Sequence, residues 1–140
     1  MTTIYKTQAT ALAGRNGQVK TNDGLLELEL SYPKEMGGTG SATNPEQLFA
    51  AGYSACFSSA IQHVAREGQM DIESAPVTAE VGIGPNDDGG FALTVGLAVE
   101  LDMPQEQALE LTRRAHQVCP YSNAVRGNID VVVTVNGEAI

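Results

Sequence analysis

The sequence predicts an α+β fold in a single domain that spans residues 1–140. Segments in which apolar and polar residues alternate, as is typical of strands, follow one another in groups, and only two segments have helical spacing. Read in order, they give two or three strands, a helix, a pair of strands, a second helix and a final strand. Because strands and helices do not alternate strictly, a doubly wound parallel sheet is not expected.

The N-terminal part is predicted to form an antiparallel meander. Residues 3–13 place apolar or β-branched side chains among polar ones, and residues 26–30 alternate leucine with glutamate. Turn signals rich in glycine and asparagine lie between them at residues 14–17 and 22–24. The glycine-rich segment 33–43 has no face that could pack, and we expect it to be a loop.

The first predicted helix begins at Asn44 and ends near Gly68. Asparagine is a good N-cap, Pro45 suits the first helical position, and Glu46 suits the positive end of the helix dipole. Few polar residues interrupt the run, so we expect the helix to be buried on most sides. Gly52 is less favourable than alanine in a helix by about 1 kcal/mol, and it therefore indicates a kink or a close contact.

The C-terminal half predicts a hairpin, a helix and a strand. Residues 77–83 and 91–99 alternate apolar and polar side chains on either side of a glycine-rich turn. Apolar residues then recur every three or four positions from about residue 103 to 118, with Asp102 as a candidate cap. Residues 129–135 are rich in valine and predict the last strand.

Composition and charge exclude several classes of function. The content of 42% hydrophobic and 18% charged residues is that of a globular protein. A formal net charge of −9 repels phosphates, so no nucleic acid or anionic membrane is expected as a partner. No signal peptide is visible, and the longest apolar run, residues 48–57, is about half the length of a membrane-spanning helix. We therefore expect a cytoplasmic protein.

The residues most able to carry chemistry are two cysteines, Cys56 and Cys119. Permanent disulfides are rare in the cytoplasm, so these residues are either inert core positions or a redox pair. His63 and His116 are too far apart in the sequence to suggest a metal motif and are expected to be ordinary polar residues of helices, so no metal site is predicted. A reactive cysteine needs a nearby cation or helix N-terminus, because the thiolate is the nucleophile. Arg15, in a glycine-flanked turn, is a candidate for that cation, although arginines in turns are usually solvated.

Two long motifs resemble a known family. They are NPEQLFAAGYSACF at residues 44–57 and CPYSN at residues 119–123, with RGN following at residues 126–128. Together with the glycine-flanked Arg15 and the loop at residues 36–38, they resemble the organic hydroperoxide resistance proteins of the OsmC-like superfamily. The resemblance covers essentially the whole chain. It implies an OsmC-like fold, in which antiparallel sheets wrap around central helices, and an intertwined homodimer.

The resemblance also implies a peroxidase that uses thiols. Cys56 matches the peroxidatic cysteine of the family and Cys119 matches its resolving cysteine. Arg15 matches the arginine that stabilises the thiolate, and Glu46 matches the carboxylate that orients this arginine. The implied substrate is an organic hydroperoxide. No cofactor is expected to be bound, because the implied reductant is a dihydrolipoyl group carried by a separate lipoylated protein.

The residue types suit this chemistry. A Cys56 thiolate would attack the peroxide and become a sulfenic acid, and Cys119 would condense with it to a disulfide that a dithiol reopens. A bidentate ion pair between Arg15 and Glu46 would fix the guanidinium plane, which a lysine could not do. We expect apolar walls to favour alkyl or fatty-acid hydroperoxides. The candidate lining residues, which could equally be plain core, are Met36, Phe49 and Phe57.

One geometric difficulty concerns Glu46 and Cys56. They are ten residues apart, which is about 15 Å of rise in a straight helix. We therefore predict a break at residues 52–54, which would place Cys56 at a second helix N-terminus; otherwise the second chain of a dimer must supply Glu46 or Arg15. Two alternative functions are an OsmC-type peroxidase with broader peroxide preference and a non-catalytic thiol redox sensor.

Overall fold

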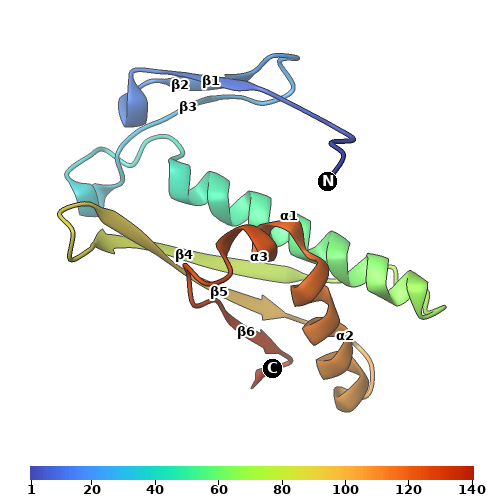
Figure 1. Cartoon of the computed structure of the whole chain (residues 1–140). Coiled ribbons are helices and arrows are strands. Elements are labelled where there is room, and N and C mark those ends of the chain that lie inside the picture. The colour runs from blue at the N-terminus through green and yellow to red at the C-terminus, as the bar shows by residue number, and fades with distance from the viewer. The chain divides into compact units, whose positions relative to one another are not determined.

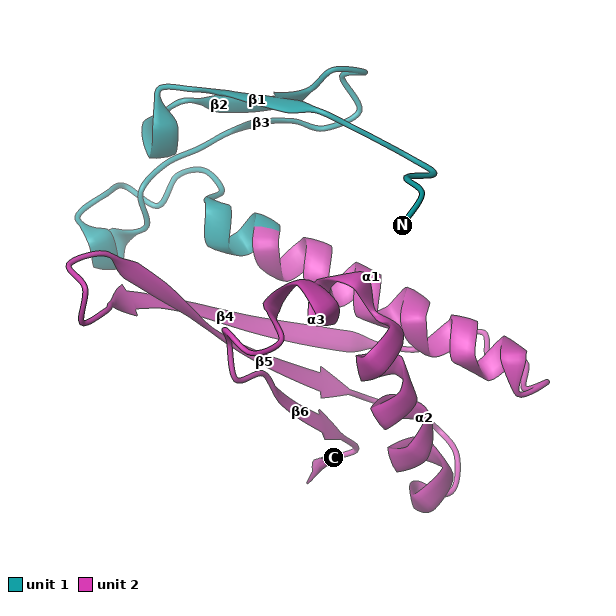
Figure 2. Cartoon of the chain, in the orientation of Figure 1, with its two compact units in different colours: residues 1–48 teal, residues 49–140 magenta.

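The computed structural model describes residues 1–140 and contains two compact units, residues 1–48 and residues 49–140 (Figure 2). Three α-helices accompany one sheet of three strands and another of four (Figure 1). The α+β prediction is therefore confirmed, whereas the assignment of one domain stays a prediction. None of the helices combines the length and the apolar character that crossing a bilayer requires.

The first unit contains the predicted antiparallel meander. Its strands pair in the order β1 (Ala9–Leu12), β2 (Gln18–Thr21) and β3 (Glu27–Glu29). The first strand is shorter than the predicted segment 3–13, because β2 offers partners only from Ala9 onward. Short turns of 3₁₀-helix follow β1 at Gly14–Asn16 and precede the long helix at Lys34–Met36.

The sheet of the second unit mixes antiparallel and parallel pairing. The hairpin predicted from the alternating pattern is present, with β4 (Val77–Pro85) antiparallel to β5 (Phe91–Val99). The next strand, β6 (Val132–Val135), runs parallel to β5, and the two-residue β7 (Glu138–Ala139) pairs with β6. Its pairing with β5 covers only residues 96–99, so β6 is shorter than the predicted segment 129–135.

The long helix α1 (Pro45–Glu67) is continuous, so the predicted break at residues 52–54 is wrong. Its start agrees with the sequence, because the Gln47 N–H donates a hydrogen bond to Asn44 Oδ1 at 2.9 Å. Tyr53, Phe57 and Ile61 share a buried face of α1, whereas the face that carries Ala51, Ala55 and Ser59 is exposed. Burial on most sides, which the sequence predicts, is thus not reached within a single chain.

The second predicted helix is α2 (Gln105–Val118), and α3 (Pro120–Val125) follows it directly. The residue before α2 is Pro104 and no side chain caps the helix, so the assignment of Asp102 as the cap is wrong. The sequence does not predict α3, because its six residues are too few to show helical periodicity.

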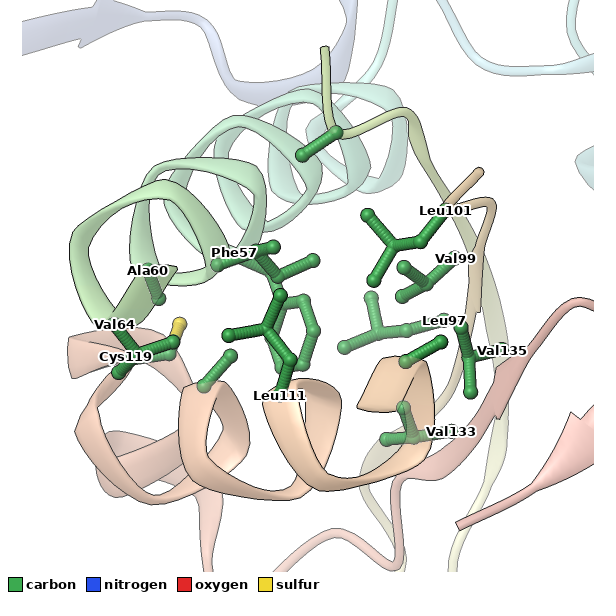
Figure 3. Packing of buried hydrophobic residues seen from close by; sticks show 14 of the residues in the cluster. Phe57, Ala60, Val64, Leu97, Val99, Leu101, Leu111, Cys119, Val133 and Val135 are labelled. Carbon is green, nitrogen blue, oxygen red and sulfur yellow. The ribbon is translucent and has the colours of Figure 1, made fainter. Parts of the chain in front are cut away.

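The core of the second unit lies between the helices and one face of the four-stranded sheet (Figures 1 and 3). Fully burying one large apolar side chain stabilises a fold by about 1.5–3 kcal/mol, so this cluster accounts for much of the unit's stability. The labelled members in Figure 3 are Phe57, Ala60, Val64, Leu97, Val99, Leu101, Leu111, Cys119, Val133 and Val135. The sulfur of Cys119 therefore belongs to a packed apolar interior.

Candidate active site

The two cysteines, 63 residues apart in the chain, lie next to each other in the second unit. The Cys119 thiol donates a hydrogen bond to Cys56 Sγ at 3.5 Å, and both cysteines are free thiols. Cys119 is fully buried and Cys56 is half-buried. The sulfurs are thus in contact but not bonded, since a disulfide needs a separation of about 2.05 Å. The structure brings together the two thiols that the sequence singles out.

Cys119 occupies the corner between α2 and α3. Its N–H donates a hydrogen bond to the Ala115 carbonyl at 2.9 Å, which ends α2, and its own carbonyl accepts one from the Asn123 N–H at 2.9 Å, which starts α3. Pro120 requires an extended conformation of the residue before it, and Cys119 has φ −62° and ψ 122°. The Cys-Pro pair therefore fixes a sharp corner with the thiol at its apex.

The surroundings of Cys56 in the second unit favour the protonated thiol. Burial of the sulfur raises the pKa of Cys56, and the adjacent Cys119 thiol adds to this effect. A hydrogen bond from the Tyr121 backbone N–H lowers that pKa, but burial outweighs it. Cys56 lies in the middle of α1 and not at a helix N-terminus, so no dipole of its own helix assists. A reactive thiolate consequently needs a further positive charge.

The first unit contains the predicted pair of Arg15 and Glu46. Arg15 Nη1 donates to Glu46 Oε2 at 2.7 Å, and Nη2 donates to Oε1 at 2.5 Å. Hydrogen bonding to Arg15 lowers the pKa of the Glu46 carboxyl, and the same bond raises the pKa of Arg15. The side chains are 21% and 14% exposed, so the guanidinium is fixed yet still accessible. Two parallel hydrogen bonds hold it in one plane.

The turn that presents Arg15 depends on its neighbours. Ala13 and Gly14 both have left-handed φ angles, 59° and 60°. A Cβ at Gly17 would lie 1.5 Å from the Leu12 carbonyl oxygen, so only glycine fits there. The flanking glycines thus enforce a tight turn at Arg15.

Gly52 is needed for a close contact and not for a kink. A Cβ at this position would lie 2.8 Å from Tyr121 Oη and 3.2 Å from Tyr121 Cε2. The Tyr121 ring also packs near Tyr53 and Phe49, with centroid separations of 5.7 and 6.3 Å. Gly52 therefore lets the residue after Cys119-Pro120 lie directly on α1, one turn before Cys56.

The substitution Gly52→Ala is expected to displace Tyr121 with little effect on global stability. The clash is with the mobile end of a side chain, and alanine gains about 1 kcal/mol of helix propensity over glycine. We expect an altered tyrosine signal in near-ultraviolet circular dichroism and a free energy of unfolding in urea within about 1 kcal/mol of the parent. The same substitution in a Tyr121→Phe background should perturb the spectrum less; an unchanged spectrum in the parent background would contradict the contact.

The remaining predicted lining residues lie in different surroundings. Phe57 is fully buried in the core, and Phe49 is half-buried beside Tyr53. Met36 belongs to the first unit and is 37% exposed. That Met36 and Phe49 line the substrate site stays a prediction. Phe57 is a core residue, which was the alternative interpretation for it.

A groove of about 340 Å³ gives access to Cys56 from the exposed side of α1. It runs along α1 and is closed on its other side by the corner that carries Cys119. Its lining residues are Cys56, Ser59, Ala60, His63, Arg66, Val118 and Pro120. Cys56 is thus the cysteine that a substrate from solvent can reach.

Sequence reasoning missed a polar cluster beside the thiols. His116, expected to be an ordinary polar helix residue, hydrogen-bonds through Nδ1 to Ser122 Oγ at 2.9 Å, and Ser122 also hydrogen-bonds to Tyr53. Ser122 lies within the CPYSN motif, which was the available signal. His63, by contrast, is an exposed helix residue that pairs with Glu67 at 3.3 Å, as expected.

Comparison with known proteins decides the family. The family model described as "OsmC-like protein" matches residues 38–134. An organic hydroperoxide resistance protein of Xanthomonas axonopodis pv. citri is 45% identical over 135 residues, which cover 94% of each chain. The chain belongs to the organic hydroperoxide resistance group of the OsmC-like family.

Solved structures agree with this OsmC-like assignment. A Vibrio cholerae protein of the organic hydroperoxide resistance type, with captopril bound in one of its active sites, superposes with a TM-score of 0.98 at 69% identity, over 100% of this chain and 97% of that one. OhrB of Bacillus subtilis gives a TM-score of 0.86 at 41% identity, over 95% and 99% of the two chains. The predicted OsmC-like fold is therefore confirmed.

Proposed function

We propose that this OsmC-like protein reduces organic hydroperoxides to alcohols with Cys56 and Cys119. The observation that carries the proposal is the contact of two free thiols at 3.5 Å, one facing a groove and the other buried behind it. The relatives' names, which state organic hydroperoxide resistance, support the same substrate class. Phe49 packs against Tyr53 and Tyr121, and we propose that these aromatic side chains favour apolar peroxides.

The proposed cycle has three steps. The Cys56 thiolate attacks one peroxide oxygen, the O–O bond breaks, and the released alkoxide takes a proton to become the alcohol. Cys56 is left as a sulfenic acid. Cys119 sulfur then displaces its hydroxyl, which leaves as water with the Cys119 proton. Finally a dihydrolipoyl group on a lipoylated protein reduces the disulfide by two thiol exchanges and becomes a cyclic disulfide itself.

Arg15 and Glu46 are proposed to stabilise the Cys56 thiolate. The unbroken α1 separates Glu46 from Cys56 by ten residues, or about 15 Å of rise, so we propose that a second copy of the chain supplies the pair in an intertwined homodimer. Two observations support this assembly. Burial raises the pKa of Cys56, which calls for an additional cation, and the small residues Ala51, Ala55 and Ser59 leave one face of α1 open for close packing.

The proposed function is tested by steady-state peroxidase assays. Cumene hydroperoxide and hydrogen peroxide are compared as substrates, each with dihydrolipoamide, thioredoxin or glutathione as the electron donor. We expect the highest kcat/KM for cumene hydroperoxide with dihydrolipoamide. Equal rates on both peroxides would indicate the broader OsmC-type preference. Stoichiometric thiol oxidation without turnover, whichever donor is present, would overturn the proposal in favour of a redox sensor.

Replacing Arg15 is expected to slow the first step. Because Arg15→Gln removes the positive charge, the pKa of Cys56 should rise. Each unit of that rise lowers the fraction of Cys56 present as thiolate near neutral pH about tenfold. We expect the rate constant with cumene hydroperoxide to fall about a hundredfold, and Arg15→Lys to give an intermediate loss because the charge stays but the planar pairing does not. Stopped-flow kinetics and thiolate absorbance against pH measure both effects. The control is Arg113→Gln, since Arg113 is an exposed arginine. An equal loss of the rate constant in this variant would contradict a specific role of Arg15.

A further inference from the structure

A buried polar cluster joins the three helices beside the cysteines. Tyr53 on α1 and Ser122 on α3 share a hydrogen bond of 2.7 Å between their hydroxyl oxygens, and His116 on α2 reaches the same Ser122 oxygen at 2.9 Å. Tyr53 and Ser122 are fully buried. One serine hydroxyl therefore links α1, α2 and α3 at a single point.

The protonation states of the cluster suit this arrangement. Burial raises the pKa of Tyr53, so its phenol stays protonated. Burial, assisted by the charge of Arg126, lowers the pKa of His116, so the imidazole is neutral. If His116 Nδ1 is an acceptor, the Tyr53 hydroxyl can donate a hydrogen bond to Ser122 Oγ, and the Ser122 hydroxyl can donate one to His116. Each of the three groups then has a hydrogen-bond partner. Removing one member leaves a buried partner unpaired, which is more damaging than losing an exposed hydrogen bond.

The cluster includes a residue that lies close to Cys119 in the chain. Ser122 follows Cys119 by three residues, in the first turn of α3. On the solvent side, Arg126 Nη2 donates to the His116 carbonyl at 2.6 Å and Nη1 donates to the Asn123 side chain. The corner that carries Cys119 is thus fixed from the interior by Ser122 and from the surface by Arg126.

We propose that Tyr53, Ser122 and His116 are positioning residues that set the rate at which Cys119 resolves oxidised Cys56. The inference rests on the proposed function and assigns the cluster to the second step of the cycle alone. In that step a sulfur–sulfur bond forms, the sulfur–oxygen bond of the sulfenic acid breaks, and the Cys119 proton leaves in the water produced.

The required movement explains why placement matters. The sulfurs must close from 3.5 Å to the disulfide length of about 2.05 Å, and a misplacement of about 1 Å can reduce a rate about a hundredfold. A corner held from the interior by Ser122 restricts the approach of Cys119 to a narrow range. In the first step no bond forms to Cys119, so that step does not depend on this restriction.

Two variants test the proposal against a matched control. Tyr53→Phe removes only a hydroxyl, and Ser122→Ala removes the shared one. The control is Thr112→Val, because Thr112 is also fully buried, lies one turn before His116 on α2, and has a hydroxyl without a partner. Each protein is mixed rapidly with one equivalent of cumene hydroperoxide. Sulfenic acid is trapped with dimedone, and disulfide is followed by mass spectrometry.

We expect Tyr53→Phe and Ser122→Ala to slow disulfide formation about tenfold or more while consumption of peroxide changes less than about twofold. Thr112→Val should change neither rate. The double variant Tyr53→Phe with Ser122→Ala should form the disulfide about as slowly as Ser122→Ala alone, because both substitutions break the same hydrogen-bond network. Equal slowing of both steps, or no slowing of disulfide formation in Tyr53→Phe, overturns the proposal. Tyr53→Phe keeps the ring, so this test remains if Ser122→Ala does not fold.

A readout without peroxide separates this inference from the proposed function. Equilibration with glutathione measures how readily Cys56 and Cys119 form their disulfide. We expect the equilibrium constant to fall about fivefold or more in Ser122→Ala and to stay unchanged in Thr112→Val. If the parent protein consumes no peroxide, the proposed function fails while this equilibrium still measures positioning. An unchanged constant in Ser122→Ala rejects the positioning role.

Discussion

We expect the substitution Cys56→Ser to abolish peroxide reduction, which is a larger effect than any other substitution should have. A serine hydroxyl is not ionised near neutral pH and does not attack a peroxide oxygen, so neither the alcohol nor a sulfenic acid should form. Cys56 is half-buried and serine is nearly isosteric, so the fold should persist. Consumption of cumene hydroperoxide and mass spectrometry of the protein after exposure measure the outcome.

The matched control for Cys56→Ser is Ser59→Ala, which changes another small residue of the same groove. It should keep turnover within about threefold, as is usual for substitutions away from reacting atoms. If Cys56→Ser kept full activity, Cys119 or another group would have to be the nucleophile. That result would reject the assignment of Cys56 as the peroxidatic cysteine.

Cys119→Ser is expected to complete the first step and then stop. Cys56 should react with one equivalent of peroxide at close to the parent rate, because its approach from the groove is unchanged. Without a resolving thiol the sulfenic acid accumulates, and excess peroxide should oxidise it irreversibly to the sulfinic acid. Burst kinetics and a mass gain of two oxygens on Cys56 would show this, and steady-state turnover with dihydrolipoamide should be lost.

Cys119 is fully buried, so Cys119→Ala serves as a second variant that introduces no hydroxyl into the core. The two variants should behave alike. Turnover at the parent rate in both would mean that the external dithiol reduces the sulfenic acid directly. Cys119 would then be a core residue that happens to touch Cys56.

Local sequence features predicted the parts of the fold that depend on local interactions. The start of α1 follows from Asn44-Pro45, whose cap is observed, and the hairpin β4–β5 follows from simple alternation. The bidentate pairing of Arg15 with Glu46 was also anticipated, but from the family resemblance and not from the residues alone. Short or weakly periodic segments such as α3 carry no comparable signal.

The errors share a physical cause, which is contact between elements that the periodicity of one segment does not reveal. Gly52 indicated either a kink or a close contact, and only Tyr121, 69 positions later, decides between them. His116 looked like an ordinary helix residue because its partner Ser122 lies around a corner that periodicity does not reveal. The sequence also could not show that α1 is buried on one face only. An apolar run does not indicate on how many sides other elements pack against the helix.

The separation of Cys56 and Cys119 along the chain has a thermodynamic consequence. A bond between them would close a loop of 63 residues, which includes the β4–β5 hairpin and α2. In the chain-entropy description such a cross-link destabilises the unfolded state by about 4 kcal/mol. Each oxidation would thus make the chain harder to unfold and to digest until a reductant arrives, so that resistance to heat or protease records the redox state of the pair.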